Sequence, residues 1–343
     1  MDNRYDVIII GAGPAGLECA KQLDHTNLSV LIIEKNEIIG PKLCAGGLSA
    51  LMNYFYIPED KTRSFSKRII AINNKYYNET LPSAVRTITR FDLGQYQLQQ
   101  IKDSETITVL TNTLITKIDE NKISTSDNEE YYFKHLVGAD GANSIVRKHL
   151  GLKSGHNIGL YFDIPVVTND FIMHFYPKQL KAGYVWVFPH QHYTNIGVCF
   201  NPKAVKAKVA KEILETYLSN NGYRISDAVM QRSSINYVYR GCFFRNMYLV
   251  GDAAGLALKG TGEGISLAII SGKEIAKKIL NPDYKAHELN TFLRIKRKQE
   301  RLLVIFELFP FLQSFFFKAY LYTIKYYNLV KNKFGIIPLH TKF

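Results

Sequence analysis

Short apolar runs that end in glycine recur along this chain, and the first of them stands at its beginning. Residues 5–10 (YDVIII) are apolar and rich in β-branched side chains, which is typical of a buried strand. The glycine-rich stretch 11–16 (GAGPAG) follows, and residues 17–23 continue with helical spacing. A second apolar run, 30–33, ends in Glu34. The pattern predicts a strand, a tight glycine turn, a helix and a second strand.

The middle of the chain has a different pattern. Its β-rich runs are short and are separated by Pro, Asn, Asp and Gly, which predicts an antiparallel sheet. A helix that covers this sheet is expected at 203–219, because apolar side chains recur there at helical spacing. The strand runs are 157–167, 171–176, 183–188 and 195–200, and the apolar helix positions are Val205, Val209, Ile213, Leu214 and Tyr217.

Helical segments are expected toward the end of the chain. One is predicted at 266–280 and two more beyond Tyr284, the first to about Leu308 and the second from Pro310 to about Val330. In the last two, apolar and aromatic residues are interleaved with Lys and Arg. Polar residues and a proline interrupt every apolar stretch, so neither segment is long enough to span a bilayer.

Composition describes a folded protein of enzyme size. With 343 residues, 46% hydrophobic and 21% charged, the chain is long enough for one extended domain or two ordinary ones. The four cysteines are scattered, with no CxxC pair and no secretory leader, so neither a disulfide framework nor a zinc site is indicated. We therefore expect a cytoplasmic location.

The opening strand, turn and helix have the spacing of a dinucleotide site. Gly11 permits the tight turn, Gly13 lets the backbone approach a phosphate, and Gly16 lets the helix pack closely on the strand. An acid at the end of the second strand can bind a ribose diol. The candidate residues are Gly11, Gly13, Pro14, Ala15, Gly16, Glu34 and Lys35.

Two later segments favour FAD over NAD. Residues 137–141 (VGADG) and 248–255 (YLVGDAAG) are apolar runs that end in Gly and Asp. They bring Asp140 and Asp252 to the carboxyl edge of the same sheet, where Asp252 is placed to meet a ribityl hydroxyl. The next helix begins in residues 259–265 (KGTGEGI), and its first amides would stabilise an anionic reduced flavin. The candidates here are Asp140, Gly141, Asp252, Gly262, Gly264 and Ile265.

Taken together, GAGPAG, GADGANSIVRK and YLVGDAAG resemble the motifs of the flavoprotein monooxygenase superfamily with the para-hydroxybenzoate hydroxylase type of fold. In that superfamily an arginine that precedes a helix contacts the flavin. Residues 89–93 (TRFDL), before a helical stretch at 95–102, are similar to that segment. The resemblance therefore implies that Arg90 contacts the cofactor.

Within the superfamily, three local motifs resemble those of the geranylgeranyl reductases, which saturate isoprenoid double bonds. Residues 41–47 (PKLCAGG) are similar to a loop over the flavin, and residues 184–189 (YVWVFP) to a strand beside the isoalloxazine. Residues 262–265 (GEGI) are the third motif. Two positions depart from the family: Ala45 follows the loop cysteine where Gly is usual, and His190 stands where a basic residue is common.

The resemblance implies that Cys44 and Ala45 contact the cofactor. Reduction of an isolated double bond needs a hydride and a proton, and Cys44 is the candidate to donate that proton or to orient a water. A small buried hydrophobic cysteine is the alternative. Tyr184, Trp186 and Phe188 alternate along their strand and share one face, so they are candidate substrate residues for a prenyl chain. Plain core packing is the alternative there.

No metal site is expected. His190 and His192 would share a strand face, but no third ligand is near them. The chain has no second GxGxxG unit, so the electron donor, whether NAD(P)H or a ferredoxin-type protein, is expected to bind transiently.

Net charge is +13, and much of the excess lies in residues 289–343, whose only acids are Glu300 and Glu307. No helix-turn-helix, zinc-finger or RNP-like pattern accompanies the charge, so nucleic acid is not expected as a partner. An anionic membrane surface fits basic and aromatic helices better, which predicts peripheral contact at the inner face of the membrane. A helical lid packed on the protein is the alternative.

The predicted class is α/β, α+β overall. A Rossmann-type FAD-binding domain (1–65, 90–160 and 240–285) carries an inserted antiparallel β-sheet substrate domain (66–89 and 161–239), and a basic, aromatic-rich helical segment (286–343) follows. The predicted function is an FAD-dependent reductase of isoprenoid double bonds. A flavin monooxygenase or halogenase is one alternative, and a membrane-associated flavoprotein without turnover is another.

Overall fold

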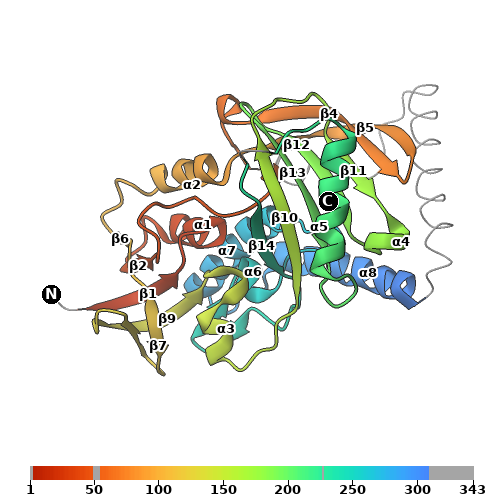
Figure 1. Cartoon of the computed structure of the whole chain (residues 1–343). Coiled ribbons are helices and arrows are strands. Elements are labelled where there is room, and N and C mark those ends of the chain that lie inside the picture. Colours follow the sequence, from red (N-terminus) through yellow and green to blue (C-terminus); the bar gives the residue numbers. More distant parts are fainter. Residues whose placement is uncertain (1–2, 49–54, 226–227, 309–343) are drawn as a thin grey trace.

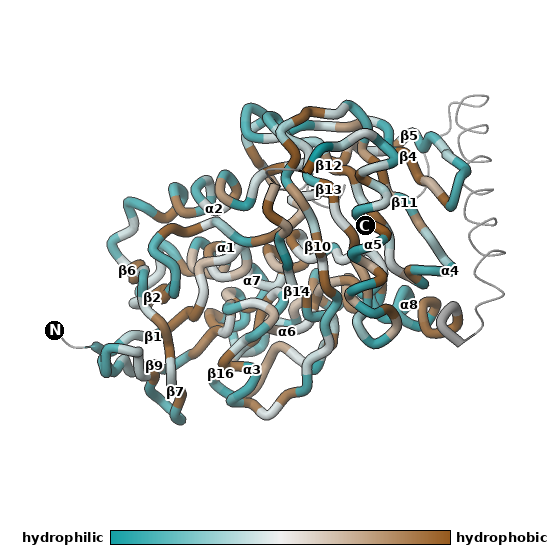
Figure 2. Tube along the Cα trace, viewed as in Figure 1, coloured by the Kyte–Doolittle hydropathy of each residue, from teal (hydrophilic) through white to brown (hydrophobic). Residues whose placement is uncertain are grey.

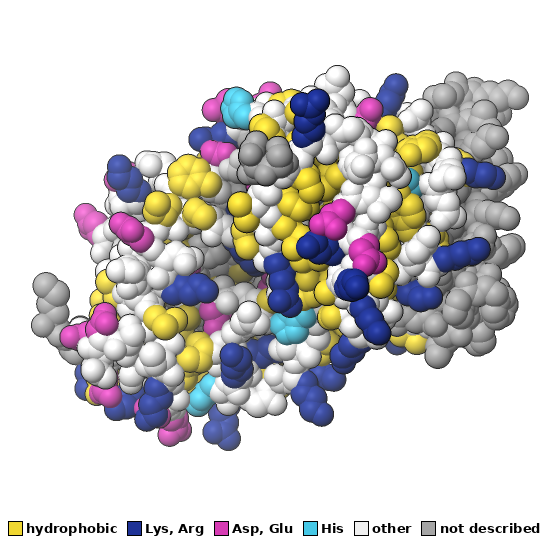
Figure 3. All heavy atoms as spheres, viewed as in Figure 1, with side chains coloured by type: hydrophobic (Ala, Val, Ile, Leu, Met, Phe, Trp, Pro, Cys, Tyr) yellow, Lys and Arg dark blue, Asp and Glu magenta, His cyan; other side chains and the backbone are white. Residues whose placement is uncertain are grey.

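Two sheets with their helices make up the described chain. The computed structural model describes residues 3–48, 55–225 and 228–308, and the two sheets lie side by side (Figure 1). Hydrophobic positions concentrate along the inner strands of both sheets, and hydrophilic positions lie mostly in the outer loops (Figure 2). On the face seen in Figure 3, hydrophobic side chains gather over the second sheet, while Lys and Arg side chains are spread widely.

The first sheet is mainly parallel and is built from the apolar runs that end in glycine. Among the described residues its strand order is β15-β16-β9-β1-β2-β6, with β7 and β8 attached at β9. Residues 7–10 of β1 are all buried, so both faces of this strand are covered. This is expected for a strand whose residues are all apolar and do not alternate with polar ones. The strands are β1 (Arg4–Ile10), β2 (Val30–Ile33), β6 (Ile107–Leu110), β7 (Ile115–Ile118), β8 (Lys122–Thr125), β9 (Glu130–Gly138), β15 (Phe243–Phe244) and β16 (Met247–Leu249).

Helices α1 and α7 pack against each other and against this sheet. Their contact is close because α7 carries Gly272, where an added Cβ would lie 2.2 Å from the carbonyl oxygen of Ala15. The helices that accompany the first sheet are α1 (Pro14–Leu23), α2 (Arg90–Gln99), α3 (Ile145–His149), α6 (Gly251–Ala254) and α7 (Ile265–Leu280), with a 3-10 turn at Gly141–Asn143. The predicted strand-turn-helix at the start of the chain is confirmed.

We expect Gly272→Ala to lower the free energy of unfolding by about 1–3 kcal/mol, because the new methyl group must push two packed helices apart. Urea denaturation of the FAD-free protein measures this. The matched control is Gly13→Ala, since Gly13 has an extended backbone (φ −78°) and its added Cβ would meet nothing closer than 4.0 Å. Equal stability of the two variants would contradict the proposed tight contact.

The second sheet is antiparallel in its central strands. Its order is β14-β10-β13-β12-β11-β4-β5-β3, and only the β11–β4 pair is parallel among those described. This confirms the antiparallel sheet expected from the middle of the chain. The strands are β3 (Gly47–Leu48), β4 (Arg63–Ile72), β5 (Lys75–Thr87), β10 (His156–Ile164), β11 (Ile172–Phe175), β12 (Tyr184–Pro189), β13 (Thr194–Phe200) and β14 (Gln231–Asn236), with a 3-10 turn at Glu59–Lys61 and α4 at Pro177–Leu180.

One face of the second sheet is covered by α5 (Ala207–Asn220), as Figure 1 shows. Val185 and Val187 of β12 point to this side and join the core beneath the helix. The helix begins four residues later than expected from 203–219. The prediction was also wrong for Val209, which is 37% exposed, because the apolar spacing does not resolve which positions lie at the edge of the buried face.

The last described element is α8 (His287–Leu308), which corresponds to the first of the two expected C-terminal helices. Leu289 and Leu293 bury its inner side in the core of the first sheet. The buried amine of Lys296 donates to the carbonyl oxygens of Ala257 (2.6 Å) and Tyr237 (2.9 Å), which fixes the helix to the segment before residue 259. The second expected helix, 310–330, lies outside the described residues. Within the described ranges, no helix is both long and apolar enough to cross a membrane.

The expected domain boundaries do not all fall between elements. The boundary at 65/66 lies inside β4, and the boundary at 160/161 lies inside β10. Both strands belong to the second sheet over their whole length, and β3 joins that sheet as well. The division of the chain into an FAD-binding domain, a substrate domain and a C-terminal segment stays a prediction, with these strands moved to the substrate part.

Candidate functional site

The glycine turn between β1 and α1 is held by close backbone contacts. Gly11 has φ +103°, and an added Cβ there would lie 2.6 Å from the carbonyl oxygen of Ala139. At Gly16 an added Cβ would lie 2.1 Å from the carbonyl oxygen of Gly11. At Gly13 the nearest protein atom would be 4.0 Å away. The fold therefore requires glycine at 11 and 16. Beside Gly13, by contrast, the protein leaves room for a ligand to approach the backbone.

Helix α1 begins in this turn with Pro14 at its first position and no side-chain cap on its first amides. Pro14 and Ala15 are buried, and the uncapped amide end of a helix attracts an anion. Glu34, at the carboxyl end of β2, accepts hydrogen bonds from the Ala12 amide (2.9 Å) and the Asn36 amide (3.0 Å). It therefore holds the turn in place, while the next residue, Lys35, is exposed.

The two later acids lie at the same edge of the first sheet. Asp140 follows β9, and its Oδ2 accepts a hydrogen bond from the Ile145 amide (2.6 Å). Its Oδ1 is buried and has no hydrogen-bond partner among the described residues. Burial raises the pKa of Asp140. Asp252 lies in the first turn of α6, beside Gly251, where an added Cβ would be 3.4 Å from the Cβ of Ala15.

The start of α7 completes this edge. Gly264 is its N-cap residue and supplies no side chain to the first amides, of which Ile265 carries the first. An added Cβ at Gly264 would lie 3.2 Å from Oδ1 of Asp252, and Gly262 has φ +70°. The beginnings of α1 and α7 and the acid Asp252 thus meet at one place, as the sequence motifs predicted.

Arg90 is buried at the start of α2. It is the first residue of the helix, and Thr89 caps the helix by accepting a hydrogen bond from the Asp92 amide (3.0 Å). The prediction placed the helix at 95–102, so its start was wrong: the Thr89 cap begins it earlier. Arg90 is only 9% exposed, and its Nε has no hydrogen-bond partner within the described chain.

These observations fit FAD. A buried guanidinium nitrogen and a buried carboxylate oxygen without partners are costly unless a ligand supplies the missing hydrogen bonds. Arg90 and Asp140 present such groups, and Gly13 leaves room for a close approach to the backbone. The uncapped starts of α1 and α7 favour a ligand with negative charge. Which of the named residues contact the cofactor stays a prediction.

The loop that contains Cys44 crosses from the first sheet to the second. On one side the Lys42 amine pairs with the Asp252 carboxylate at 3.0 Å. On the other side Nε2 of His190 donates to the carbonyl oxygen of Ala45 at 3.0 Å. Burial lowers the pKa of His190, so the ring is neutral at pH 7. The loop therefore lies between the predicted cofactor edge and His190, the residue that follows the carboxyl end of β12.

Cys44 differs from the other three cysteines of the chain. It is half-buried, whereas Cys19, Cys199 and Cys242 are buried, and all four are free thiols. Burial raises the pKa of Cys199 and of Cys242 to about 12 each. The Gly46 amide donates to the Cys44 sulfur at 3.4 Å, so a negative charge that develops on this sulfur would be stabilised.

The aromatic face of β12 lies against this loop. Tyr184, Trp186 and Phe188 are buried together in one cluster, which confirms that they share a face. An added Cβ at Gly47 would lie 2.9 Å from the Phe188 ring. Burial raises the pKa of Tyr161, which belongs to the same cluster and forms a hydrogen bond with the Cys44 backbone. The aromatic face and the Cys44 loop are therefore in contact.

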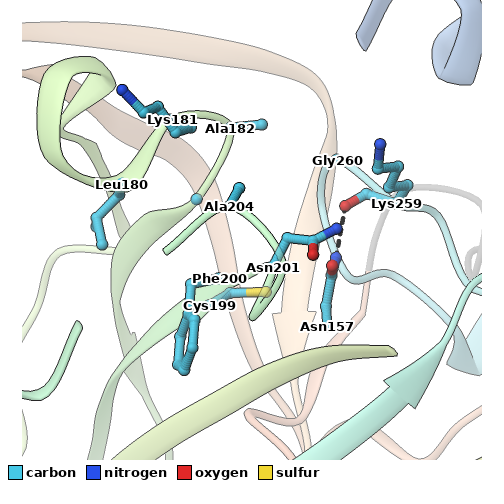
Figure 4. Close-up of a pocket in the computed structure, with 11 residues that line it drawn as sticks. Asn157, Leu180, Lys181, Ala182, Cys199, Phe200, Asn201, Ala204, Lys259 and Gly260 are labelled. Atoms are coloured by element: carbon cyan, nitrogen blue, oxygen red, sulfur yellow. Dashed lines mark hydrogen bonds between the residues drawn. The ribbon is translucent and has the colours of Figure 1, made fainter. Parts of the chain in front are cut away.

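The same face also touches the segment before α7. The Tyr184 hydroxyl donates to the carbonyl oxygen of Thr261, and an added Cβ at Gly262 would be 3.8 Å from the Cys199 sulfur. Beyond Cys199 lies a pocket between α4, the end of β13 and residues 259–260 (Figure 4). In it Asn157 donates to the carbonyl oxygen of Lys259 (2.7 Å), and its own Oδ1 is buried without a partner in the described chain. The aromatic face thus ends near a small pocket whose lining includes the amide side chains of Asn157 and Asn201.

Three residues with clear roles at this site were not assigned one from the sequence. Lys42 and His190 fix the two ends of the Cys44 loop. Arg147 is buried and donates to the carbonyl oxygens of Ala253 (2.9 Å) and Val238 (2.6 Å), which supports α6 from below. Only a basic residue inside the GADGANSIVRK motif signalled Arg147. The prediction that His190 and His192 share a strand face was wrong, because β12 ends at Pro189 and both residues lie in the following turn.

Comparisons with known proteins agree with this geometry. The sequence profile of the pyridine nucleotide-disulphide oxidoreductase family matches residues 5–163, which include the glycine turn, Arg90 and Asp140. An uncharacterised protein of Methanosarcina barkeri is 30% identical over 336 residues, which cover 92% of this chain and 84% of that protein. The similarity therefore extends over both sheets.

Two further proteins are similar along most of their length. A digeranylgeranylglycerophospholipid reductase of Methanosphaera stadtmanae is 29% identical, over 84% of this chain and 81% of its own. The crystal structure of a geranylgeranyl bacteriochlorophyll reductase-like protein from Thermoplasma acidophilum superposes with a TM-score of 0.72 at 22% identity, over 89% of this chain and 87% of that one.

Proposed function

The chain belongs to the geranylgeranyl reductase family of FAD-dependent oxidoreductases, and from this premise we propose that it saturates carbon-carbon double bonds of a geranylgeranyl or other isoprenoid chain. One observation carries the proposal. The Cys44 loop contacts the predicted cofactor edge through Lys42 and Asp252, and the aromatic face of β12 through Gly47 and Phe188. A double bond held on this face is therefore close to both the cofactor edge and the Cys44 thiol.

Saturation of a double bond adds one hydride and one proton. Reduced FAD, when bound, supplies the hydride from N5 of its flavin. In our proposal the Cys44 thiol gives its proton to the other carbon, and the remaining thiolate accepts the hydrogen bond that the Gly46 amide already donates to the sulfur. Because Cys44 is half-buried, solvent can return the proton. No other cysteine of the chain is accessible in this way.

An isoprenoid chain suits the surroundings of this thiol. In our proposal an apolar chain lies against the buried aromatic cluster that contains Tyr184, Trp186 and Phe188. The Methanosphaera stadtmanae relative is named for an isoprenoid lipid, a digeranylgeranylglycerophospholipid. We extend this class of substrate to the present chain. Electrons are proposed to reach the flavin from NAD(P)H or from a ferredoxin-type donor that binds transiently.

Oxygen uptake tests the proposal against the alternative functions. The purified, reduced protein is mixed with a geranylgeranyl substrate in air, and oxygen consumption and product are measured together. A reductase forms the saturated product, and the substrate does not stimulate oxygen consumption. Substrate-stimulated oxygen consumption with a hydroxylated or halogenated product would show a monooxygenase or halogenase. No product from any prenyl substrate would favour the flavoprotein without turnover.

We further propose that α8 makes peripheral contact with the cytoplasmic face of a membrane, where lipid substrates are found. The outward side of the helix is exposed and carries Arg294, Lys298 and Arg301 beside Ile295 and Leu302. Basic side chains attract an anionic surface, and apolar side chains between them can enter its headgroup region. The inner side of α8 approaches the small pocket at Asn157, since an added Cβ at Gly260, which lines that pocket, would lie 3.1 Å from Leu303.

The double variant Arg294→Gln with Lys298→Gln is expected to weaken binding to vesicles that contain phosphatidylglycerol by roughly 30-fold, at about 1 kcal/mol for each basic residue. Vesicle co-sedimentation at low salt measures this. The matched control is Lys148→Gln with Lys153→Gln, two exposed lysines near α3, which is expected to bind like the parent protein. Equal vesicle binding by both double variants would contradict membrane contact through α8. It would favour the alternative, in which this helical segment is a lid packed on the protein.

A further inference from the structure

Trp186, the only tryptophan of the chain, lies in a slot that the second sheet provides for it. Its cross-strand partner is Gly197, where an added Cβ would lie 2.4 Å from Cζ2 of the indole. On the next strand, an added Cβ at Gly159 would lie 3.3 Å from Cη2 of the same ring. The indole therefore extends across β13 toward β10, and side chains at these two glycines would displace it.

The polar side of the indole is fixed by a chain of hydrogen bonds. The indole N–H donates to Oδ1 of Asn195 at 2.6 Å, and Nδ2 of Asn195 donates to Oδ1 of Asp163 at 2.7 Å. The other carboxylate oxygen of Asp163 accepts a hydrogen bond from Nε2 of Gln231 at 2.9 Å. Asn195 is 1% exposed and Trp186 is 4% exposed, so water does not replace these contacts.

The order of this chain allows only one orientation of the Asn195 amide. An ionised carboxylate only accepts hydrogen bonds, so Asn195 must turn its NH2 group toward Asp163. Its oxygen then faces the indole, which can only donate. Asp163 thus sets the direction of the amide, and the amide sets the direction of the indole. Asn195 is the cross-strand partner of both Phe188 and Asp163. The hydrogen bonds that join Trp186, Asn195 and Asp163 therefore lie on the aromatic face itself.

We propose that Asn195, oriented by Asp163, is a positioning residue that fixes the Trp186 indole and thereby selects the length of isoprenoid chain that the enzyme reduces, a role that rests on the proposed function. Trp186 lies between Tyr184 and Phe188, with ring centroids 6.3 Å and 6.2 Å from theirs. A rotated indole would change the middle of the face along which the chain lies. Asn195 itself does not contact the reacting atoms in this scheme.

The test uses Asn195→Leu, which keeps the number and branching of the side-chain heavy atoms and removes the acceptor. In the FAD-free protein, the single tryptophan is expected to show a shifted emission maximum and a lower anisotropy. The ratio of kcat/KM for a geranylgeranyl substrate to that for a farnesyl substrate is expected to change about tenfold, because a buried indole N–H without an acceptor no longer prefers one position. Asp163→Asn no longer restricts the Asn195 amide to one orientation, because an amide both donates and accepts, and it is expected to shift the emission and the ratio in the same direction by a smaller amount.

Unchanged tryptophan emission in Asn195→Leu would overturn the proposal. An equal loss of activity with both chain lengths, at an unchanged ratio, would also overturn it, because that result indicates a purely structural role. If Asn195→Leu does not fold, Asn195→Ser serves in the same comparison, since its hydroxyl is too short to reach both partners. If the parent protein reduces neither substrate, the proposed function is contradicted, and the proposed selection of chain length is contradicted with it. The emission of Asn195→Leu still tests separately whether Asn195 positions the indole.

Discussion

Alanine at position 13 is expected to reduce FAD affinity by roughly 10- to 100-fold while the protein stays folded. Gly13 has an ordinary extended backbone, and its added Cβ would be 4.0 Å from the nearest protein atom, so the fold tolerates the methyl group. The methyl group would instead occupy the space in which the pyrophosphate approaches the backbone, at a cost of about 1–3 kcal/mol. Titration of the FAD-free protein with FAD, followed by flavin fluorescence, measures the dissociation constant.

The comparison variant for this prediction is Gly16→Ala. Its methyl group would lie 2.1 Å from the carbonyl oxygen of Gly11, so we expect lower thermal stability as well as weaker FAD binding. The difference between the two variants separates a glycine that the ligand requires from one that the fold requires. If Gly13→Ala bound FAD like the parent protein, the pyrophosphate would have to lie elsewhere.

Replacement of Cys44 by alanine is expected to reduce turnover of a prenyl substrate by about 100- to 10,000-fold, the usual range for loss of a positioned general acid. Thermal stability should stay at the parent value, and FAD affinity should change far less than turnover, because only one of the predicted cofactor contacts is altered. The thiol is half-buried, and its one hydrogen bond in the described chain comes from the Gly46 amide. Single-turnover reduction of a geranylgeranyl substrate measures the effect on the chemical step.

The control for Cys44→Ala is Leu43→Ala, which changes the neighbouring side chain in the same loop. Leu43 is 45% exposed, so its removal should leave turnover within a few-fold of the parent. Unchanged turnover in Cys44→Ala would remove the thiol from the mechanism and would assign the proton to another group. Equal losses in both variants would indicate that the shape of the loop, rather than the thiol, is what catalysis requires.

Features that depend on neighbouring residues in the chain could be predicted from the sequence. The turn at Gly11 needs a positive φ and the contact at Gly16 needs a missing side chain, and both needs are visible in a six-residue motif. The shared face of Tyr184, Trp186 and Phe188 follows from the alternation of a strand. These requirements are local, so a single sequence displays them.

Features that depend on contacts between distant segments could not be predicted. The Lys42–Asp252 ion pair joins residues 210 positions apart, and neither residue type signals its partner. The hydrogen bond from Trp186 to Asn195 depends on how β12 pairs with β13, which the pattern of apolar residues does not specify. The early start of α2 at Arg90 was missed because the resemblance placed the arginine before the helix, although the Thr89 cap was present in the sequence.

Anaerobic oxidation of the reduced flavin by a prenyl substrate tests the central claim most directly. The purified protein is reduced without oxygen and mixed with a geranylgeranyl lipid, while flavin absorbance and the mass of the lipid are followed together. The reductase proposal predicts that the flavin becomes oxidised in step with saturation, with one added hydrogen molecule for each oxidised flavin. A flavin that stays reduced until oxygen is admitted, with the lipid unchanged in mass, would contradict it.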